Sequence, residues 1–173
     1  SALGYYGVSM ETIATRVGIS AAALYRHYSS KYELFRDAVL NLGQQLVDCT
    51  AFGDDATGDP ELILRRLVSA LIDTAMANRE SGGLYRWEGR YLRGDQATLI
   101  AQMRTVHRRI QLPLSRIRPE LTSRQRWTLS TAMLSVIGSI VDHRAKLPAI
   151  QVRALLAELA DAVLAAEVPD VED

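Results

Sequence analysis

A short segment near the start of the sequence carries side chains that could bind nucleic acid. Arg26 can donate to a guanine edge or to a phosphate. Tyr25, His27 and Lys31 supply further donors close to it in the sequence. Because phosphates lie on both sides of the DNA major groove, donors that flank a central arginine are suited to contact them. These four side chains form a candidate DNA-binding group.

Two short helices are expected to position this group. Ser9 is a good N-cap for a helix over residues 10–17, because its oxygen can accept from the free amides of the first turn. Gly18 suits the end of that helix, since glycine tolerates a positive φ, and Ser20 can cap a second helix. A helix, a short turn with glycine and a second helix form the helix-turn-helix layout.

The second helix is expected to have one packed face and one free face. At 100° per residue, Leu24 and Tyr28 share one face, with Ile19 beneath them. Ala22 and Arg26 lie on the opposite face. A free face that begins with small alanines can approach base edges closely, as a recognition helix in a major groove must.

A third, longer helix is expected to lead away from the helix-turn-helix. Ser30 and Glu33 fit a capping box that opens it, and it can run to about Thr50. We expect a DNA-binding domain over residues 1–47 and a second domain over residues 48–173.

The second domain is expected to be a series of helices separated by clear breaks. Asp59 and Pro60 start one helix, Thr122 and Gln125 fit a capping box that opens another, and Pro113 interrupts the hydrogen bonding of a third. The expected helices cover residues 60–77, a short segment between 83 and 94, residues 95–117, residues 122–146 and the chain from residue 148 onward.

The composition favours an all-α protein. The chain has 173 residues, of which 48% are hydrophobic and 23% charged. Its formal net charge is zero, so any binding to nucleic acid must be local. The sequence has no secretory signal and no run of about 18 apolar residues that could span a bilayer. We therefore expect a cytoplasmic protein with no membrane partner.

The sequence offers little support for catalysis or metal binding. The three histidines, His27, His107 and His143, have no metal-ligand spacing to one another. Cys49 has no nearby basic cluster that would favour a thiolate, and we expect it to be a buried small residue. A glycine-rich phosphate loop and a nucleophile elbow are both absent. We expect no enzymatic activity, no metal and no cofactor.

The N-terminal residues resemble the DNA-binding domain of TetR-type bacterial transcriptional regulators. The matching residues are Gly4, Tyr5, Ser9, Ile13, Ala14, Val17, Gly18, Ile19, Ser20, Leu24, Tyr25, His27, Tyr28, Ser30, Lys31, Glu33 and Leu34. Their order and spacing are far more specific than a bare helix-turn-helix. With the helical faces above, the expected DNA contacts are Ser9, Ser20, Ala21, Ala22, Tyr25, Arg26, His27 and Lys31.

The sequence departs from the family pattern in two places. TetR-type domains open with a helix that packs across the other two, but only three residues precede Gly4 here. We therefore expect that first helix to be incomplete. The run Ala21–Ala23 offers methyl groups but no hydrogen bonds to bases. Specificity would then depend on Arg26, on amides at the helix end and on DNA shape.

The resemblance implies a helical ligand-binding and dimerisation domain, in which the last two helices pair with their copies in a second chain. Small or polar residues along one helix and an apolar stripe along the other agree with this. The expected interface residues are Ala132, Ser135, Gly138, Ser139, Val152, Leu155, Leu156, Leu159 and Val163. Alternatively, both stripes belong to the core of one chain.

A ligand pocket would lie among the middle helices. Its expected lining is Trp87, Tyr91, Met103, His107, Trp127 and Met133, although aromatic and Met side chains at such positions are more often core. His107 alternatively is a partly exposed helix residue. Arg86, Arg90 and Arg93 fall on one helix face. They are either a solvated face or a site for an anionic ligand.

The sequence thus predicts a homodimeric regulator, most simply a repressor, that binds a palindromic operator in double-stranded DNA and is released by a small apolar effector. An anionic effector is the sharper hypothesis. The alternative from another class is a helical small-molecule carrier or protein-interaction domain with a merely structural helix-turn-helix.

Overall fold

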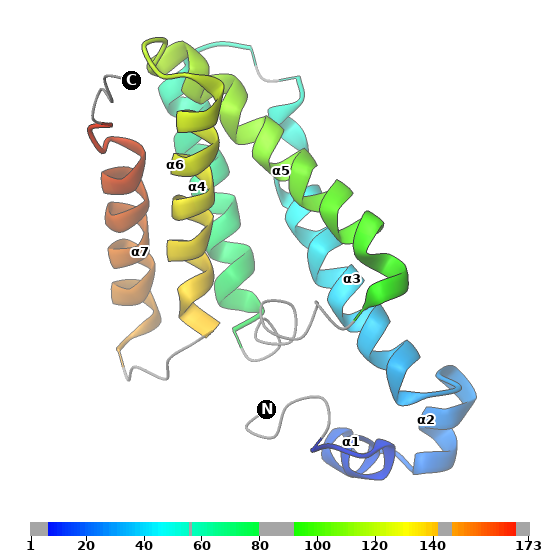
Figure 1. Cartoon of the computed structure of the whole chain (residues 1–173). Helices are drawn as coiled ribbons and strands as arrows, with labels where there is room; N and C mark the ends of the chain where they lie inside the picture. The colour runs from blue at the N-terminus through cyan, green and yellow to red at the C-terminus, as the bar shows by residue number, and fades with distance from the viewer. Residues whose placement is uncertain (1–6, 56, 80–91, 142–146, 169–173) are drawn as a thin grey trace.

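The computed structural model describes residues 7–55, 57–79, 92–141 and 147–168. Within these ranges the protein is all-α, as the sequence predicts. The helices are α1 (Met10–Val17), α2 (Ala21–His27), α3 (Lys31–Cys49), α4 (Pro60–Ala77), α5 (Gln96–Ile117), α6 (Ser123–Gly138) and α7 (Ala149–Leu164). Figure 1 shows α1 and α2 at one end of the molecule, with α3 connecting them to the bundle of α4 to α7. We call α1 and α2 the head and α4 to α7 the body.

Local capping explains where the first two helices begin and end. The Ser9 hydroxyl accepts from the amide of Thr12 at 3.1 Å, and the Ser20 hydroxyl accepts from the amide of Ala23 at 3.1 Å. Gly18 ends α1 with φ +77°, a backbone conformation that side chains rarely adopt. The helix-turn-helix layout inferred from the sequence is therefore confirmed.

The start of α3 differs in one detail from the expected capping box. Ser30 caps the helix, since its hydroxyl accepts from the amide of Glu33 at 3.2 Å. The Glu33 carboxylate does not return to Ser30 but accepts from the amide and the hydroxyl of Ser29, at 2.9 and 2.7 Å. These bonds lower the pKa of Glu33, because they stabilise its charged form. Glu33 thus holds the link between α2 and α3.

The body follows most of the predicted helices. Asp59 caps α4, and Thr122 and Gln125 form a reciprocal capping box at α6. Helix α5 continues past Pro113 to Ile117. The predicted continuation of α6 to residue 146 is wrong, because α6 ends at Gly138 and a 3₁₀ turn follows over Ser139–Val141.

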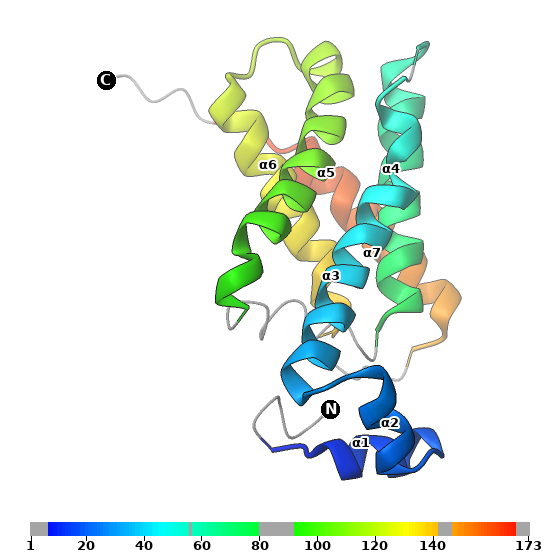
Figure 2. The same cartoon turned by 90° about the vertical axis from the view of Figure 1, so that its right-hand side faces the viewer.

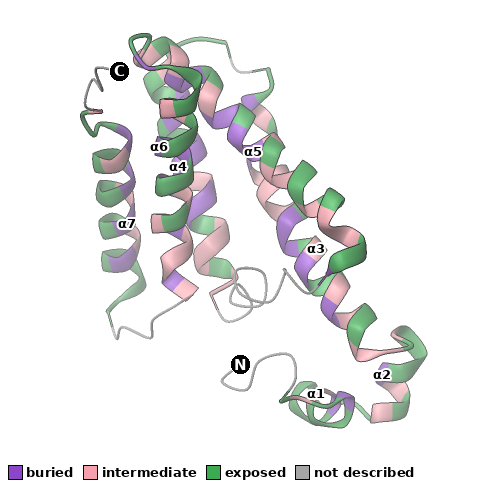
Figure 3. Ribbon diagram, viewed as in Figure 1, coloured by how far each residue is buried: buried purple, intermediate pink, exposed green. Residues whose placement is uncertain are grey.

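The buried residues divide into three clusters of very different size. Sixteen buried side chains from α4 to α7, the α5–α6 connection and the turn after α6 form the core of the body. The head contributes only Met10, Ala14 and Leu24. Phe35 and Val39 of α3 pack with Leu92 in a third cluster. Figure 2 shows α3 standing between the head and the body, and Figure 3 shows the buried faces of the body helices turned toward one another.

Candidate nucleic-acid interface and its link to the body

The free face of α2 agrees with the predicted recognition surface. Leu24 is buried in the head, whereas Ala22, Tyr25 and Arg26 are exposed. His27 is also exposed, at the end of the helix. Arg26 thus projects from the surface opposite the packed face, and the small Ala22 leaves the first turn of α2 open to close approach.

The remaining predicted DNA contacts have local roles as well. Ser9 and Ser20 are exposed, and each uses its hydroxyl to cap the helix that follows it. Ala21 is half-buried and packs against the core of the head. Lys31 is half-buried and donates from Nζ to the carbonyl of Val8 at 3.0 Å. An ammonium group carries three donors, so this bond does not exhaust Lys31.

The packed face of the head differs from the sequence prediction at one position. Tyr28 packs beside Leu24 as expected, together with Ile13 and Leu34. Ile19 does not lie beneath them, because it sits in the turn and is exposed. Leu34 of α3 takes that place instead.

A pair of charged groups fixes the N-terminal part of α3, near the head. Arg36 of α3 donates from Nε and a terminal nitrogen to both carboxylate oxygens of Asp95, at 2.8 and 2.9 Å. Asp95 lies in the 3₁₀ turn Arg93–Asp95, directly before α5. This bidentate pair raises the pKa of Arg36, because it stabilises the guanidinium ion. The start of α5 is therefore tied to α3 close to the head.

Further along α3, away from the head, Gly43 leaves a notch that receives the Gln102 side chain of α5. Gly43 is buried, and a Cβ at this position would overlap Oε1 of Gln102. The Gln102 amide donates to the carbonyl of Leu40 at 3.1 Å, while its Oε1 is buried without a hydrogen-bond partner. The absence of a side chain at Gly43 is what permits this close approach of α5.

A buried arginine fixes the C-terminal end of α3. Arg109 of α5 is 5% exposed and donates to the carbonyl of Val47 at 2.6 Å and to the hydroxyl of Thr50 at 3.1 Å. It also pairs with Asp54, which accepts from Arg108 as well, at 2.9 Å. The Arg109 hydrogen bond is the main cause that lowers the pKa of Asp54 to about 2. Three polar contacts thus join α3 to α5 or to the turn before α5. They are centred on Arg36, Gln102 and Arg109, and we call them the α3 pins.

Sequence reasoning did not identify the pins. Their partners are 59 to 62 residues apart in the chain, so no local pattern links them. The only usable signal was the interior position of Gly43 in a long helix, where glycine costs about 1 kcal/mol and suggests a close approach.

Four of the predicted ligand residues lie in the described part of the chain, and they differ in exposure. Met133 is fully buried in the body core. His107 is 6% exposed rather than partly exposed, and its Nδ1 lies 2.9 Å from the Ser130 hydroxyl. Trp127 is 43% exposed and stacks on His107 with ring centroids 4.0 Å apart. Met103 is half-buried on α5. Trp87, Tyr91, Arg86 and Arg90 lie outside the described residues, as do Gly4, Tyr5 and His143.

The predicted interface residues divide between core and surface. Val152 and Leu156 are buried within one chain, so their part of the α7 stripe belongs to the body core. Leu155 and Leu159 are 49% and 44% exposed. The remaining predicted residues are exposed in the case of Ala132 and Ser135, and half-buried in the case of Gly138, Ser139 and Val163.

Other kinds of site find no support in the described part of the chain. No group of three or more His, Cys, Asp or Glu side chains in it could hold a metal ion. None of its helices is both long and apolar enough to cross a membrane. Cys49 is half-buried, and burial raises the pKa of its thiol, so it is not activated as a nucleophile.

Comparisons with known proteins agree with this geometry. Residues 1–38 match the model of the family described as bacterial regulatory proteins, tetR family. Over 70 residues the chain is 36% identical to the HTH-type transcriptional activator FasR of Mycolicibacterium smegmatis. That alignment covers 40% of this chain and 32% of FasR, so the chain matches about a third of this relative's length.

Two solved structures share the fold over nearly the whole chain. The TetR-family regulator PfmR from Thermus thermophilus superposes with a TM-score of 0.79 and 22% identity, covering 94% of this chain and 91% of PfmR. A regulatory protein of the tetR family from Rhodococcus has a TM-score of 0.78 and 18% identity, covering 94% of this chain and 87% of that protein.

The fold and the exposed α2 face define a helix-turn-helix protein with an all-α body. Its residues 1–38 match the model of the tetR family, in agreement with the resemblance drawn from the sequence. The matched family and the two similar structures are all described as bacterial or transcriptional regulators.

Proposed function

We propose that this chain is a ligand-responsive transcriptional regulator that binds operator DNA through α2. The observation that carries the proposal is the exposed face of Ala22, Tyr25 and Arg26, which lies opposite the buried Leu24 on a capped helix. Such a helix can enter a major groove with Arg26 at the base edges. A carrier or interaction domain would not need this arrangement at a tip of the molecule.

The test is a mobility shift with promoter DNA from beside the protein's own gene. A regulator slows the migration of the promoter DNA even in the presence of excess unrelated DNA. A carrier with a structural helix-turn-helix slows the migration of neither DNA. Specific binding is expected to exceed nonspecific binding by roughly 10³-fold or more at physiological salt. Equal retardation of both DNAs would contradict the proposal.

The proposed regulator acts as a homodimer through α6 and α7. Leu155 and Leu159 are large apolar side chains left exposed on α7, and Ala132 on α6 is small enough for a partner helix to approach. A two-fold dimer places two heads on one side of DNA, so the operator is a near-palindrome with half-sites about 34–36 Å apart or a multiple of this.

Sedimentation of Leu159→Glu tests the dimer. A buried carboxylate without a partner would split the interface, so the variant should sediment as a monomer at concentrations where the wild type is a dimer. Leu62→Glu is the matched control, since Leu62 is an exposed leucine on α4. A monomeric wild type, or a Leu159→Glu variant that stays dimeric, would contradict the proposed interface.

The proposed effector is a small apolar acid that enters beside α3. Trp87, Tyr91 and Met103 are its proposed contacts, and movement of α3 against α5 would tilt the head. Release of the operator by about 100-fold requires a coupling of about 2.7 kcal/mol. Trp87→Ala should weaken the effect of added acyl or aromatic acids on the operator complex while leaving ligand-free DNA binding intact. Loss of DNA binding in the variant would instead assign Trp87 to the core.

Repression is the simpler sign of regulation, because blocking a promoter needs only DNA occupancy. Activation, as named for FasR, would require a further contact with the transcription machinery. A reporter assay with and without the regulator distinguishes the two. Deletion of a repressor raises reporter expression, whereas deletion of an activator lowers it.

A further inference from the structure

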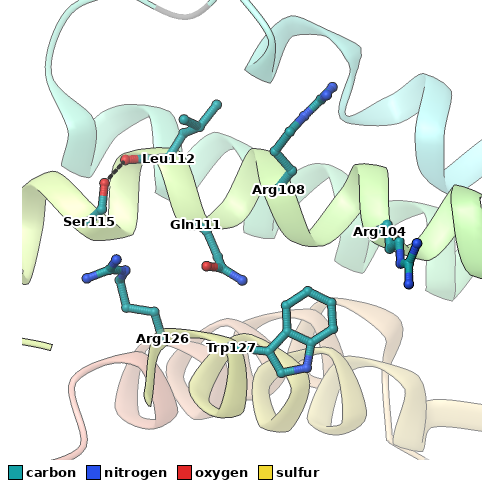
Figure 4. Close-up of a pocket in the computed structure, with 7 residues that line it drawn as sticks. All are labelled: Arg104, Arg108, Gln111, Leu112, Ser115, Arg126 and Trp127. Atoms are coloured by element: carbon teal, nitrogen blue, oxygen red, sulfur yellow. Dashed lines mark hydrogen bonds between the residues drawn. The ribbon is translucent and has the colours of Figure 1, made fainter. Parts of the chain in front are cut away.

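A groove between α5 and α6 lies on the outer side of the body. It is an open groove with a volume of about 550 Å³, within the usual size of small-molecule sites. Figure 4 shows Gln111 pointing from α5 toward α6, while Arg126 and Trp127 point from α6 toward α5. Arg104 lines the same groove from α5. The side chains that meet here are therefore cationic, amide and aromatic.

The positive charge of this groove is only partly balanced. Arg104 and Arg108 lie one turn apart on α5, a spacing at which like charges destabilise a helix. Arg108 is paired with Asp54, but the guanidinium of Arg104 has no carboxylate partner among the described residues. Arg126 donates to neutral acceptors, the Leu121 carbonyl and the Ser123 hydroxyl, and its Nε is buried without a partner. Within the described ranges, neither the Arg104 nor the Arg126 guanidinium has a carboxylate partner.

The aromatic wall of the groove is held in place from behind. His107 stacks on Trp127 at 4.0 Å with 21° between the ring planes, and the Ser130 hydroxyl fixes His107. Burial lowers the pKa of His107, so the ring behind the indole is neutral at physiological pH. Trp127 nevertheless remains 43% exposed. A fixed and exposed indole is a stacking surface for a planar ligand.

We propose that the α5–α6 groove binds a planar organic anion, an aromatic carboxylate, which stacks on Trp127 and pairs with Arg104 and Arg126. Gln111 would supply an additional amide donor to the carboxylate. The proposal does not depend on DNA binding.

Calorimetry and tryptophan fluorescence test the proposal on the full chain without DNA. The probe is 2-naphthoate, and 2-naphthamide is the uncharged control of the same shape. A Trp87→Phe background leaves Trp127 as the only tryptophan, so its quenching reports stacking directly. We expect saturable quenching of Trp127 by naphthoate, with at least about tenfold weaker binding of naphthamide at this site.

Arg104→Gln is the decisive variant, because Arg104 is exposed and holds no other described side chain in place. It should weaken naphthoate binding by about tenfold and leave naphthamide binding unchanged. Arg116→Gln is the matched control on the same helix outside the groove, and it should bind naphthoate as the wild type does. The proposal is overturned if the wild type does not bind naphthoate, if naphthamide binds equally well, or if Arg104→Gln has no effect. The mobility shift with promoter DNA would stand in each of these cases.

Discussion

The head and the body differ in how much of their structure they can hold by themselves. The body buries sixteen side chains in one core, whereas in the described chain the core of α1 and α2 has three buried residues. A small core that relaxes easily gives low local stability. The head therefore depends on its caps and on Leu34 of α3, and the body sets the stability of the molecule.

Helix α3 belongs to both regions and joins them. Leu34 packs with the head, while Leu46 and Val47 pack against the body core. Between these ends, the α3 pins fix the helix against α5 through directional polar contacts. Apolar contacts would permit α3 to slide, but the pins define discrete positions. The pins are therefore one route by which a change in the body can reach the head.

The largest expected effect is a loss of global stability when the body core is truncated. Leu71 is 1% exposed and lies in that core. Leu71→Ala should lower the free energy of unfolding by about 3–5 kcal/mol, because it removes apolar contacts and leaves a cavity. Urea denaturation followed by circular dichroism measures this. A loss below about 1 kcal/mol would contradict the assignment of the main core to the body.

The equivalent truncation in the head should act locally. Leu24→Ala is expected to cost about 2–3 kcal/mol, toward the lower end for a buried leucine, since few residues surround it. Amides of α1 and α2 should lose protection from hydrogen exchange, while those of α4 and α6 should keep theirs. DNA binding should be lost at the same time. Uniform loss of protection in both regions would mean that head and body unfold together.

A double substitution at Gly43 and Gln102 tests the Gln102 pin, because the effect of Gly43→Ala on the free energy of unfolding should depend on whether Gln102 is present. In a Gln102→Ala background, Gly43→Ala should stabilise the protein by up to about 1 kcal/mol, because alanine favours the helix over glycine. In the wild type the same change should give no stabilisation, because the new Cβ must displace the Gln102 side chain. Thermal or urea unfolding of the four proteins yields the coupling. Additive effects would remove Gln102 from the pins.

The smallest expected effect is the pH dependence of the Arg109 pin. The pKa of Asp54 is lowered from 3.8 to about 2 in the folded protein. The contribution of Asp54 is therefore fully present above its unfolded pKa and is lost as the pH falls from about 4 toward 2. The stability difference between wild type and Asp54→Asn should be constant above about pH 4 and shrink below it. Asp55→Asn is the neighbouring control, and a similar pH dependence of its difference from the wild type would contradict this account.

The sequence was a good guide wherever structure depends on neighbours in the chain. Ser9, Ser20 and Thr122 cap the predicted helices, because capping is a contact within three residues. The exposed side of α2 followed from the 100° period around Leu24. The resemblance then added what the periodicity could not, namely the function expected of that face.

The sequence was a poor guide wherever structure depends on distant partners. No local pattern in the sequence indicates that Arg109 is buried against α3 while Arg104 remains exposed. The apolar stripe of α7 did not indicate that Leu156 is buried in the core whereas Leu155 is exposed. Both are leucines, and the sequence does not show which side of α7 another helix covers. The end of α6 was also missed, because Gly138 was interpreted as a position of close helix packing although glycine also commonly ends helices.

The most direct test of the central claim is the affinity of the full chain and of Arg26→Ala for operator DNA, measured by fluorescence anisotropy at several salt concentrations. Arg26→Ala should weaken specific binding by about 1–3 kcal/mol and relax the preference at one base pair. Lys31→Ala should weaken binding to all sequences alike and reduce the salt slope by about one. Arg65→Ala, an exposed arginine on α4, should bind as the wild type does. If Arg26→Ala binds the operator as tightly and as selectively as the wild type, α2 is not the recognition helix.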